Sequence, residues 1–225
     1  MKIWVTRTQP GAAATAERLS ALGHEPIVAP LLDVRRLDAP IDLTGIAAIA
    51  LTSANAAEGL SGGDIPVFAV GEATAHAALR AGFSDVQSAS GDVYALGQRI
   101  AASLPPGAMV LHPCAAERAG DLEAPLANAG LKLRLLPVYE TLPAPVDAAI
   151  LRALAGADAV LLHSPKAARI LTALLQSHPS TLDRAFCLSQ AVADALKGIK
   201  IANVAVATLS NDTALLNLVS HDPRA

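Results

Sequence analysis

Aromatic side chains and charges are both scarce in this chain of 225 residues. Phenylalanine, tyrosine and tryptophan together make up 3% of the residues, charged residues make up 16%, and the formal net charge is −3. So few aromatics argue against a platform for stacking nucleic-acid bases. The near-zero charge argues against a nucleic-acid-binding protein, which usually has a basic face. The two cysteines, Cys114 and Cys187, predict neither a disulfide framework nor a metal site.

Long hydrophobic runs are also missing, although 52% of the residues are hydrophobic and the mean hydropathy is +0.42. Runs such as 46–51 and 159–162 are much shorter than the roughly 20 residues of a membrane span. The chain begins directly with a strand-like segment, residues 1–5, without the apolar region of a signal peptide. We therefore expect a cytoplasmic protein that does not bind membranes. The apolar content excludes a disordered chain, and the length is sufficient for a large hydrophobic core.

Short apolar segments alternate with segments of helical period along the whole chain, which predicts an α/β fold with parallel sheets. The predicted strands are 2–6, 26–34, 46–52, 66–70, 84–88, 107–111, 131–139, 158–162, 184–188 and 203–207. The predicted helices are 11–22, 54–60, 72–81, 92–103, 115–129, 165–176, 190–197 and 211–220. Gly23, Gly82 and Gly130 follow predicted helices, where a left-handed residue is favoured.

The chain also contains an internal repeat, in which five strand–helix units recur in the same order. Residues 47–57 resemble 158–168, residues 68–75 resemble 186–193, and 90–92 resemble 210–212. Ten strands in two sets suggest two sheets of about five strands. A simple tandem would divide near residue 105. A swapped arrangement, in which the middle of the chain forms an inserted domain, fits the pattern equally well.

The ends of the predicted strands carry small and hydroxylated residues, and ligands of open α/β sheets bind at this edge. The segments concerned are 6–8, 52–53, 71–74, 90–91, 112–114, 163–165 and 189. Backbone N–H groups at helix N-termini favour anions. Any single Ser or Thr here is explained by helix capping. Their recurrence at most strand ends favours a site for an anionic ligand.

Other sequence patterns are weaker evidence for a functional site. No phosphate-binding loop, dinucleotide fingerprint or nucleophile elbow is present. His112 and His163 end equivalent strands without a third metal ligand, and Cys114 is interpreted as a structural thiol. The cations Arg7, Arg118 and Lys166 occupy strand-to-helix turns where they would pair with carboxylates. Tyr139 is either a proton donor or a packed amphipathic side chain.

These residues resemble the uroporphyrinogen-III synthase family over almost the whole chain. In the N-terminal half the matching stretches are 5–7, Gly23, 29–31, 51–56 and 70–75, and in the C-terminal half they are 112–114 with Arg118, 138–141, 163–165 and Ser189. Each is degenerate by itself, but they occur in the family's order. Ala54, Asn55 and 190–192 depart from the residues common among relatives.

The resemblance implies two flavodoxin-like, parallel-sheet α/β domains joined by a two-stranded connector, one domain being discontinuous. The first domain would comprise 1–34 and 143–225, and the second, inserted domain 38–135. The connector strands would be 31–37 and 136–142. The resemblance also implies an open arrangement of the domains that closes on substrate.

The resemblance further implies a lyase that converts linear hydroxymethylbilane into uroporphyrinogen III, losing water and inverting ring D through a spiro intermediate. No cofactor or metal takes part. The implied partners are this anionic tetrapyrrole and, transiently, the enzyme that forms it, and the implied state is a monomer. Tyr139 resembles the family's candidate acid. The implied substrate-binding residues are Arg7, Thr52, Ser53, Gly71, Ala73, Thr74, Ser90, Ser164, Lys166 and Ser189.

Three other functions compete with this interpretation. A transferase of two similar α/β domains would show a sugar-nucleotide or metal-carboxylate motif, and the sequence has none. A non-catalytic protein that closes on a small anion would bind the substrate without giving an isomer-specific product. An inactive member of the family would keep the fold, and the departures at Asn55 and Gln190 leave this reading open.

Overall fold

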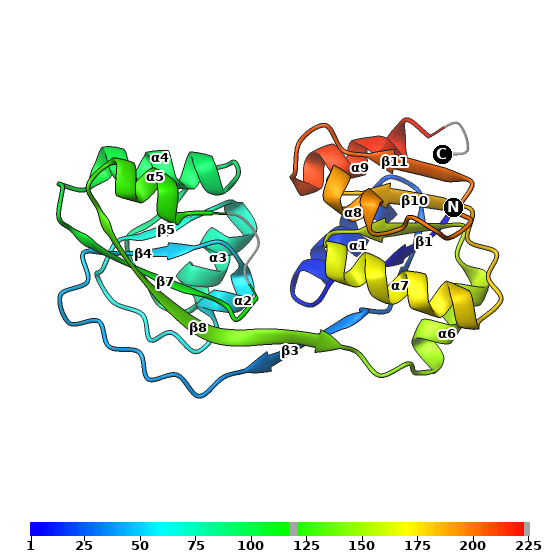
Figure 1. The fold of residues 1–225 in the computed structure, drawn as a ribbon, viewed down its shortest axis with the longest axis horizontal. Coiled ribbons are helices and arrows are strands. Elements are labelled where there is room, and N and C mark those ends of the chain that lie inside the picture. The colour runs from blue at the N-terminus through cyan, green and yellow to red at the C-terminus, as the bar shows by residue number, and fades with distance from the viewer. Residues whose placement is uncertain (118–120, 223–225) are drawn as a thin grey trace. The chain divides into compact units, whose positions relative to one another are not determined.

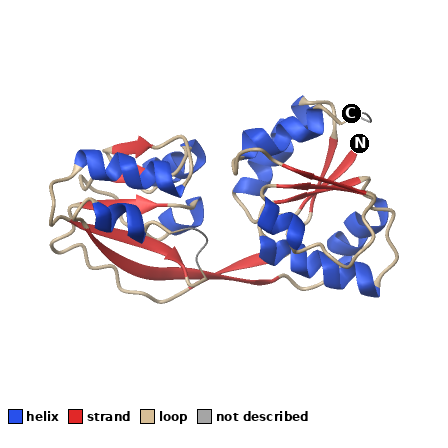
Figure 2. Cartoon of the chain, turned by 45° about the horizontal axis from the view of Figure 1, so that its top comes forward, coloured by secondary structure: helices blue, strands red, loops and turns tan. Residues whose placement is uncertain are grey.

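A computed structural model of the chain describes residues 1–117 and 121–222. Residue contacts divide the chain into two compact units, unit 1 (Met1–Asp33 with Leu142–Ala225) and unit 2 (Val34–Thr141). In each unit a mainly parallel sheet lies between helices, seen as red strands and blue helices in Figure 2. The predicted α/β fold with parallel sheets is therefore confirmed.

Unit 1 contains a five-stranded parallel sheet with the strand order β11-β10-β9-β1-β2 (Figure 1). Its strands are β1 (Lys2–Val5), β2 (Glu25–Val28), β9 (Ala159–Leu162), β10 (Arg184–Cys187) and β11 (Asn203–Val206). Its helices are α1 (Gly11–Ala21), α6 (Ala148–Gly156), α7 (Pro165–Ser177), α8 (Gln190–Asp194) and α9 (Asp212–Ser220). Trp4 of β1 pairs with Val160 of β9. A tandem division near residue 105 would not give this pairing.

The alternation of side chains along β1 explains how this sheet is covered on both faces. Ile3 and Val5 point into a cluster with Ala12 and Leu19 of α1 and with apolar residues of α9. Trp4 points to the other face, where α6, α7 and α8 pack. All three strand residues are fully buried, as expected of a central parallel strand.

Unit 2 repeats this pattern with the strand order β3-β8-β7-β4-β5-β6. Its strands are β4 (Ala48–Leu51), β5 (Val67–Ala69), β6 (Val86–Ser88) and β7 (Met109–Ala115). At one edge lie β3 (Leu32–Arg36) and β8 (Lys132–Pro143), each of which has two residues in unit 1. Its helices are α2 (Ala54–Ala57), α3 (Glu72–Arg80), α4 (Val93–Ser103) and α5 (Glu123–Asn128). One face packs against α2 and α3, and the other packs against α4 and α5.

Hydrogen bonds support the repeat seen in the sequence. In unit 1 the Thr6 hydroxyl donates to the carbonyl of Leu161 at 2.7 Å. In unit 2 the His112 Nδ1 lies 2.8 Å from the carbonyl of Ala50. Leu161 and Ala50 are matching positions of the two repeats, so the same carbonyl accepts a hydrogen bond from the neighbouring strand in each unit.

Two predicted elements differ clearly from the structure, and one helix was not predicted. The predicted strand 26–34 is two strands, because the chain leaves the sheet of unit 1 at Ala29 and Pro30, and β3 pairs with β8 instead. The predicted helix 115–129 is wrong in its first part, since β7 continues to Ala115 and α5 begins only at Glu123. Helix α6 was not predicted, although Asp147 caps its first turn by accepting hydrogen bonds from the N–H groups of Ala149 and Ile150.

The helix ends predicted at three glycines are confirmed. Gly23, Gly82 and Gly130 have φ angles of +81°, +93° and +70°, the left-handed conformation that glycine adopts without strain. Among the helices of residues 1–117 and 121–222, none combines the length and the apolar character that a membrane span requires.

Candidate functional site

The carboxyl edge of each sheet carries most of the predicted site residues. In an open α/β sheet the ligand site lies where the connections from two neighbouring strands leave toward opposite faces. In unit 1 this point lies between β1 and β9, which are followed by Arg7 and by Ser164. In unit 2 it lies between β7 and β4, and Thr52 and Ser53 follow β4.

Hydrogen bonding divides the predicted hydroxyl residues into two groups. Ser53 and Ser164 cap α2 and α7, accepting hydrogen bonds from Asn55 N–H and Ala167 N–H at 3.2 Å each. Ser189 occupies the N-cap position of α8 without a side-chain cap. Within the described part of the chain, the hydroxyls of Thr52, Thr74 and Ser189 have no recorded partner. Capping therefore accounts for Ser53 and Ser164, whereas the other three hydroxyls remain available to a ligand.

The predicted residues at the ends of β5 and β6 lie close together. Gly71 is the N-cap of α3, and Ala73 and Thr74 lie in its first turn, Ala73 exposed and Thr74 buried. Ser90 follows β6 with a φ of +52°, which is unusual for a residue with a side chain. Its hydroxyl donates to Glu72 Oε1 at 3.3 Å. This strained serine is held at the strand ends of unit 2, as is common for functional positions.

Tyr139 of β8 is only 7% exposed, and its phenol lies near the side chain of Ser53. Burial raises the pKa of Tyr139, and the nearby side chain of Ser53 opposes this effect. The phenol is therefore protonated at neutral pH. It can donate a proton and lies beside a residue at the carboxyl edge of the unit 2 sheet.

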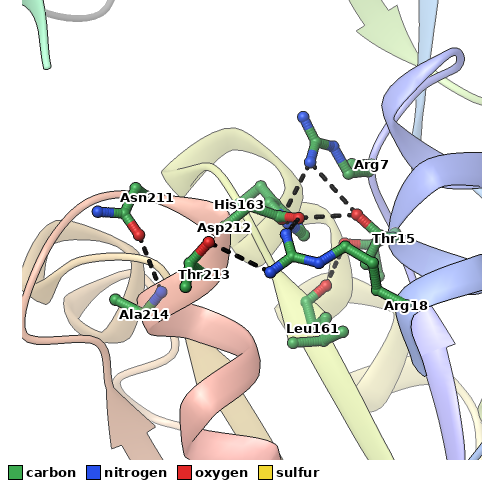
Figure 3. Close-up of polar contacts among 10 residues, drawn as sticks. Arg7, Thr15, Arg18, Leu161, His163, Asn211, Asp212, Thr213 and Ala214 are labelled. Carbon is green, nitrogen blue, oxygen red and sulfur yellow. Dashed lines mark hydrogen bonds and ion pairs between the residues drawn. The ribbon is translucent and has the colours of Figure 1, made fainter. Parts of the chain in front are cut away.

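In unit 1, four elements bring polar side chains together around Asp212 (Figure 3). Asp212 Oδ1 accepts from Arg7 Nη1 at 3.1 Å and lies 3.0 Å from His163 Nε2. Its Oδ2 accepts from Arg18 Nη1 at 2.8 Å. Arg7 Nη1 also donates to the Thr15 hydroxyl at 3.3 Å. We call these five residues the Asp212 cluster.

Burial and charge set the protonation states in the Asp212 cluster. Burial raises the pKa of Asp212, but its hydrogen bond with His163 and the charges of Arg7 and Arg18 lower it by more, so the net shift is downward. Burial lowers the pKa of His163 more than the bond with Asp212 raises it. At neutral pH the imidazole is therefore uncharged and donates from Nε2 to the Asp212 carboxylate. Its buried Nδ1 has no hydrogen-bond partner among the described residues.

The predicted cations do not form a single group. Arg7 lies in the Asp212 cluster, and Lys166 is the second residue of α7. Arg118 lies outside the described residues. Asp212, Thr15 and Gly11, which contact or adjoin Arg7, are not among the predicted site residues. Asp212 and Arg7 are 205 positions apart in the sequence, so no local pattern relates them.

Both cysteines are buried. Burial raises the pKa of the Cys187 thiol to about 12, so this thiol is not a nucleophile at neutral pH. Cys114 is 2% exposed and packs near Tyr139, in agreement with a structural thiol. Among residues 1–117 and 121–222, no group of three or more His, Cys, Asp or Glu side chains is placed to hold a metal ion.

The lowered pKa of His163 predicts a loss of stability in mild acid. The unfolded chain takes up a proton near the usual pKa of 6.5, whereas the folded chain does so only at lower pH. Stability should therefore be constant above that value and fall as the pH drops below it. Below the usual Asp pKa of 3.8, the lowered pKa of Asp212 adds a second loss. Thermal midpoints between pH 7.5 and 5 should fall less for His163→Gln than for the parent, and parallel curves would contradict the assignment.

A sequence model of one protein family, described as uroporphyrinogen-III synthase HemD, matches residues 13–217. The chain belongs to the uroporphyrinogen-III synthase family. Members are enzymes of tetrapyrrole biosynthesis, and the function of this chain lies in haem biosynthesis. No curated protein matches the chain closely enough to be counted as a relative.

A solved structure of another synthase shows a related fold. The crystal structure of uroporphyrinogen-III synthetase from Helicobacter pylori 26695 is 20% identical, with 97% of each chain covered and a TM-score of 0.61. The wild-type synthase from the extremely thermophilic bacterium Thermus thermophilus is 20% identical, with 98% of this chain and 96% of that chain covered and a TM-score of 0.41. At this identity, the likeness to the Helicobacter protein concerns the fold.

Proposed function

We propose that this chain cyclises hydroxymethylbilane to uroporphyrinogen III, losing water and inverting ring D, with Tyr139 as the proton donor. The family match over residues 13–217 supports the reaction. One observation supports the role of Tyr139: its buried phenol stays protonated and lies near Ser53 at the end of a central strand. A positioned acid of this kind typically contributes to rate without being indispensable.

We propose further that units 1 and 2 are two flavodoxin-like domains, 1–34 with 143–225 and 38–135, joined by connector strands 31–37 and 136–142. The order β2-β1-β9-β10-β11 is the 2-1-3-4-5 order of flavodoxin-like sheets. The order β8-β7-β4-β5-β6 is the same when β7 is counted first. Leu37 N–H donates to the carbonyl of Val138, which supports pairing of the two connector strands.

The substrate carries eight carboxylates, and both units offer donors for them. In unit 2 we assign this role to Thr52, Ser53, Gly71, Ala73, Thr74 and Ser90. In unit 1 we assign it to Arg7, Ser164, Lys166 and Ser189. The first-turn N–H groups and the hydroxyls of Thr52, Thr74 and Ser189, which have no side-chain partner among the described residues, support the assignment, because both recognise carboxylates without a high density of cations. Binding the flexible bilane at several points would favour the folded geometry that ring closure needs.

The proton balance of the reaction suits a phenol. The carbon–oxygen bond of the terminal hydroxymethyl group breaks, and the hydroxyl leaves with the electron pair. The proton of Tyr139 converts it into water. The substituted carbon of ring D then forms a bond to the freed methylene carbon, which gives the spiro intermediate. The bond between ring D and its original bridge carbon breaks, and that bridge carbon bonds to the free α-carbon of ring D instead. This α-carbon releases one proton, which restores the phenol. No oxidant, reductant or further reactant is needed.

A product assay tests this function. The purified protein is mixed with freshly generated hydroxymethylbilane, and the products are oxidised and separated by chromatography. Uncatalysed closure gives the type I isomer without inversion. We expect type III to predominate. Type I alone, from protein shown to be folded, would contradict the catalytic proposal and favour a binding protein or an inactive member of the family.

A further inference from the structure

The guanidinium of Arg7 is bound on one side only. Its Nη1 donates to Asp212 and to Thr15. Figure 3 shows the other terminal nitrogen pointing away from Asp212. Within the described part of the chain, Nε and Nη2 have no recorded partner, and the side chain is 32% exposed. Nε and Nη2 are a parallel pair of donors, which is the geometry that binds both oxygens of a carboxylate.

Gly11 leaves the space that this guanidinium occupies. A Cβ atom on Gly11 would lie 2.5 Å from Arg7 Nε and 2.6 Å from both Cζ and Nη2. Gly11 is the first residue of α1 and does not have a positive φ, so the backbone itself tolerates other residues. Glycine is therefore needed at this position for Arg7 to lie against the start of α1.

Asp212 is not needed to cap α9. The N-cap is Asn211, whose side chain accepts from Ala214 N–H at 2.8 Å. Asp212 instead directs its carboxylate at Arg7, Arg18 and His163. Because His163 is neutral, two guanidinium cations surround one carboxylate, and one positive charge remains. The Asp212 cluster thus holds Arg7 without cancelling the attraction for an anion.

We propose that Asp212 and Gly11 are positioning residues for Arg7, which they hold so that Nε and Nη2 bind one carboxylate of the tetrapyrrole. This proposal rests on the proposed function, because that function supplies the carboxylate ligand. It assigns to Asp212 and Gly11 an effect on substrate binding that acts through Arg7. Neither residue touches the reacting atoms, so kcat should change little.

A double-mutant cycle tests whether Asp212 acts through Arg7. Asp212→Asn, Arg7→Ala and Gly11→Ala are each expected to raise KM about 10-fold and to change kcat less than about 2-fold, a loss comparable to one charged hydrogen bond. In the Arg7→Ala background, Asp212→Asn and Gly11→Ala should have no further effect. If the effect of Asp212→Asn or Gly11→Ala on KM adds fully to that of Arg7→Ala, the proposal is overturned. Asp147→Asn, the same change at the N-cap of α6, is the matched control and should leave KM unchanged.

Binding of uroporphyrin III, measured by its fluorescence, separates this proposal from the proposed function because it requires no turnover. Each of the three single variants should raise the Kd for uroporphyrin III by about the same factor as it raises KM. An inactive parent with non-additive losses of binding would refute the function and keep the carboxylate site. An active parent whose variants show additive losses of binding would support the proposed function and refute the positioning role of Asp212 and Gly11. If Asp212→Asn fails to fold, Gly11→Ala decides alone, since the three atoms nearest its Cβ all belong to Arg7, and an unchanged KM would overturn the proposal.

Discussion

Tyr139→Phe is expected to lower kcat about 100-fold while the product remains type III, because a positioned general acid typically contributes 10²–10⁴-fold. The phenol is 7% exposed, and burial keeps its pKa above the usual value. The proton is therefore retained until the hydroxyl of the bilane departs. Phenylalanine keeps the ring in the apolar cluster that also contains Val138 and Leu51, so only the phenol hydroxyl is removed.

Single-turnover kinetics with isomer analysis measure this effect. Tyr94→Phe is the matched control, because Tyr94 is the other tyrosine and is 63% exposed on α4. Its kcat should equal that of the parent. An unchanged kcat for Tyr139→Phe would show that Tyr139 is a packing residue. A fall to the uncatalysed rate with type I product would show that the enzyme depends entirely on this acid, contrary to the positioning mechanism.

Local patterns predicted most of the secondary structure because the signals were themselves local. The glycines after α1, α3 and α5 end helices by their backbone freedom, whatever the tertiary contacts. The region 115–129 was misjudged because its Ala- and Leu-rich composition suits a helix, yet β7 extends to Ala115 along β8. Pairing between strands overrode helix propensity at Ala115. Helix α6 was missed although Asp147 and the apolar period after it were present.

The site was predicted in outline but not in its contacts. Hydroxyl residues at strand ends are visible in the sequence, and several of them lie at the carboxyl edges of the two sheets. Which hydroxyls are used as caps depends on backbone geometry, so Ser164 and Ser189 cannot be told apart beforehand. The contact of Arg7 with Asp212 arises because α1 and α9 cover the same face of the unit 1 sheet. Such pairs follow from topology, which short motifs do not encode.

The largest expected effect on stability comes from Gly62, which lies between α2 and β5. A Cβ atom there would lie 2.2 Å from the carbonyl carbon and oxygen of Gly82. Both sides of this contact are backbone, and Gly82 has a φ of +93° at the end of α3. The adjacent Gly63 and Phe83 form a β-bridge, and Ser84 N–H donates to the Gly63 carbonyl at 3.2 Å. Gly62→Ala must therefore separate two segments of unit 2.

We expect Gly62→Ala to lower the free energy of unfolding by about 3 kcal/mol, the upper range for overpacking. For a domain of this size, that corresponds to a midpoint about 12 °C lower. Gly156→Ala is the control, because Gly156 ends α6 in open space without a positive φ, and alanine there should be neutral or slightly stabilising. If the two units are separate domains, calorimetry of Gly62→Ala should show one transition shifted and the other unchanged, since the added methyl strains only unit 2. A single transition that moves as a whole would contradict independent domains, and an unshifted profile would contradict the close approach of Gly62 to Gly82.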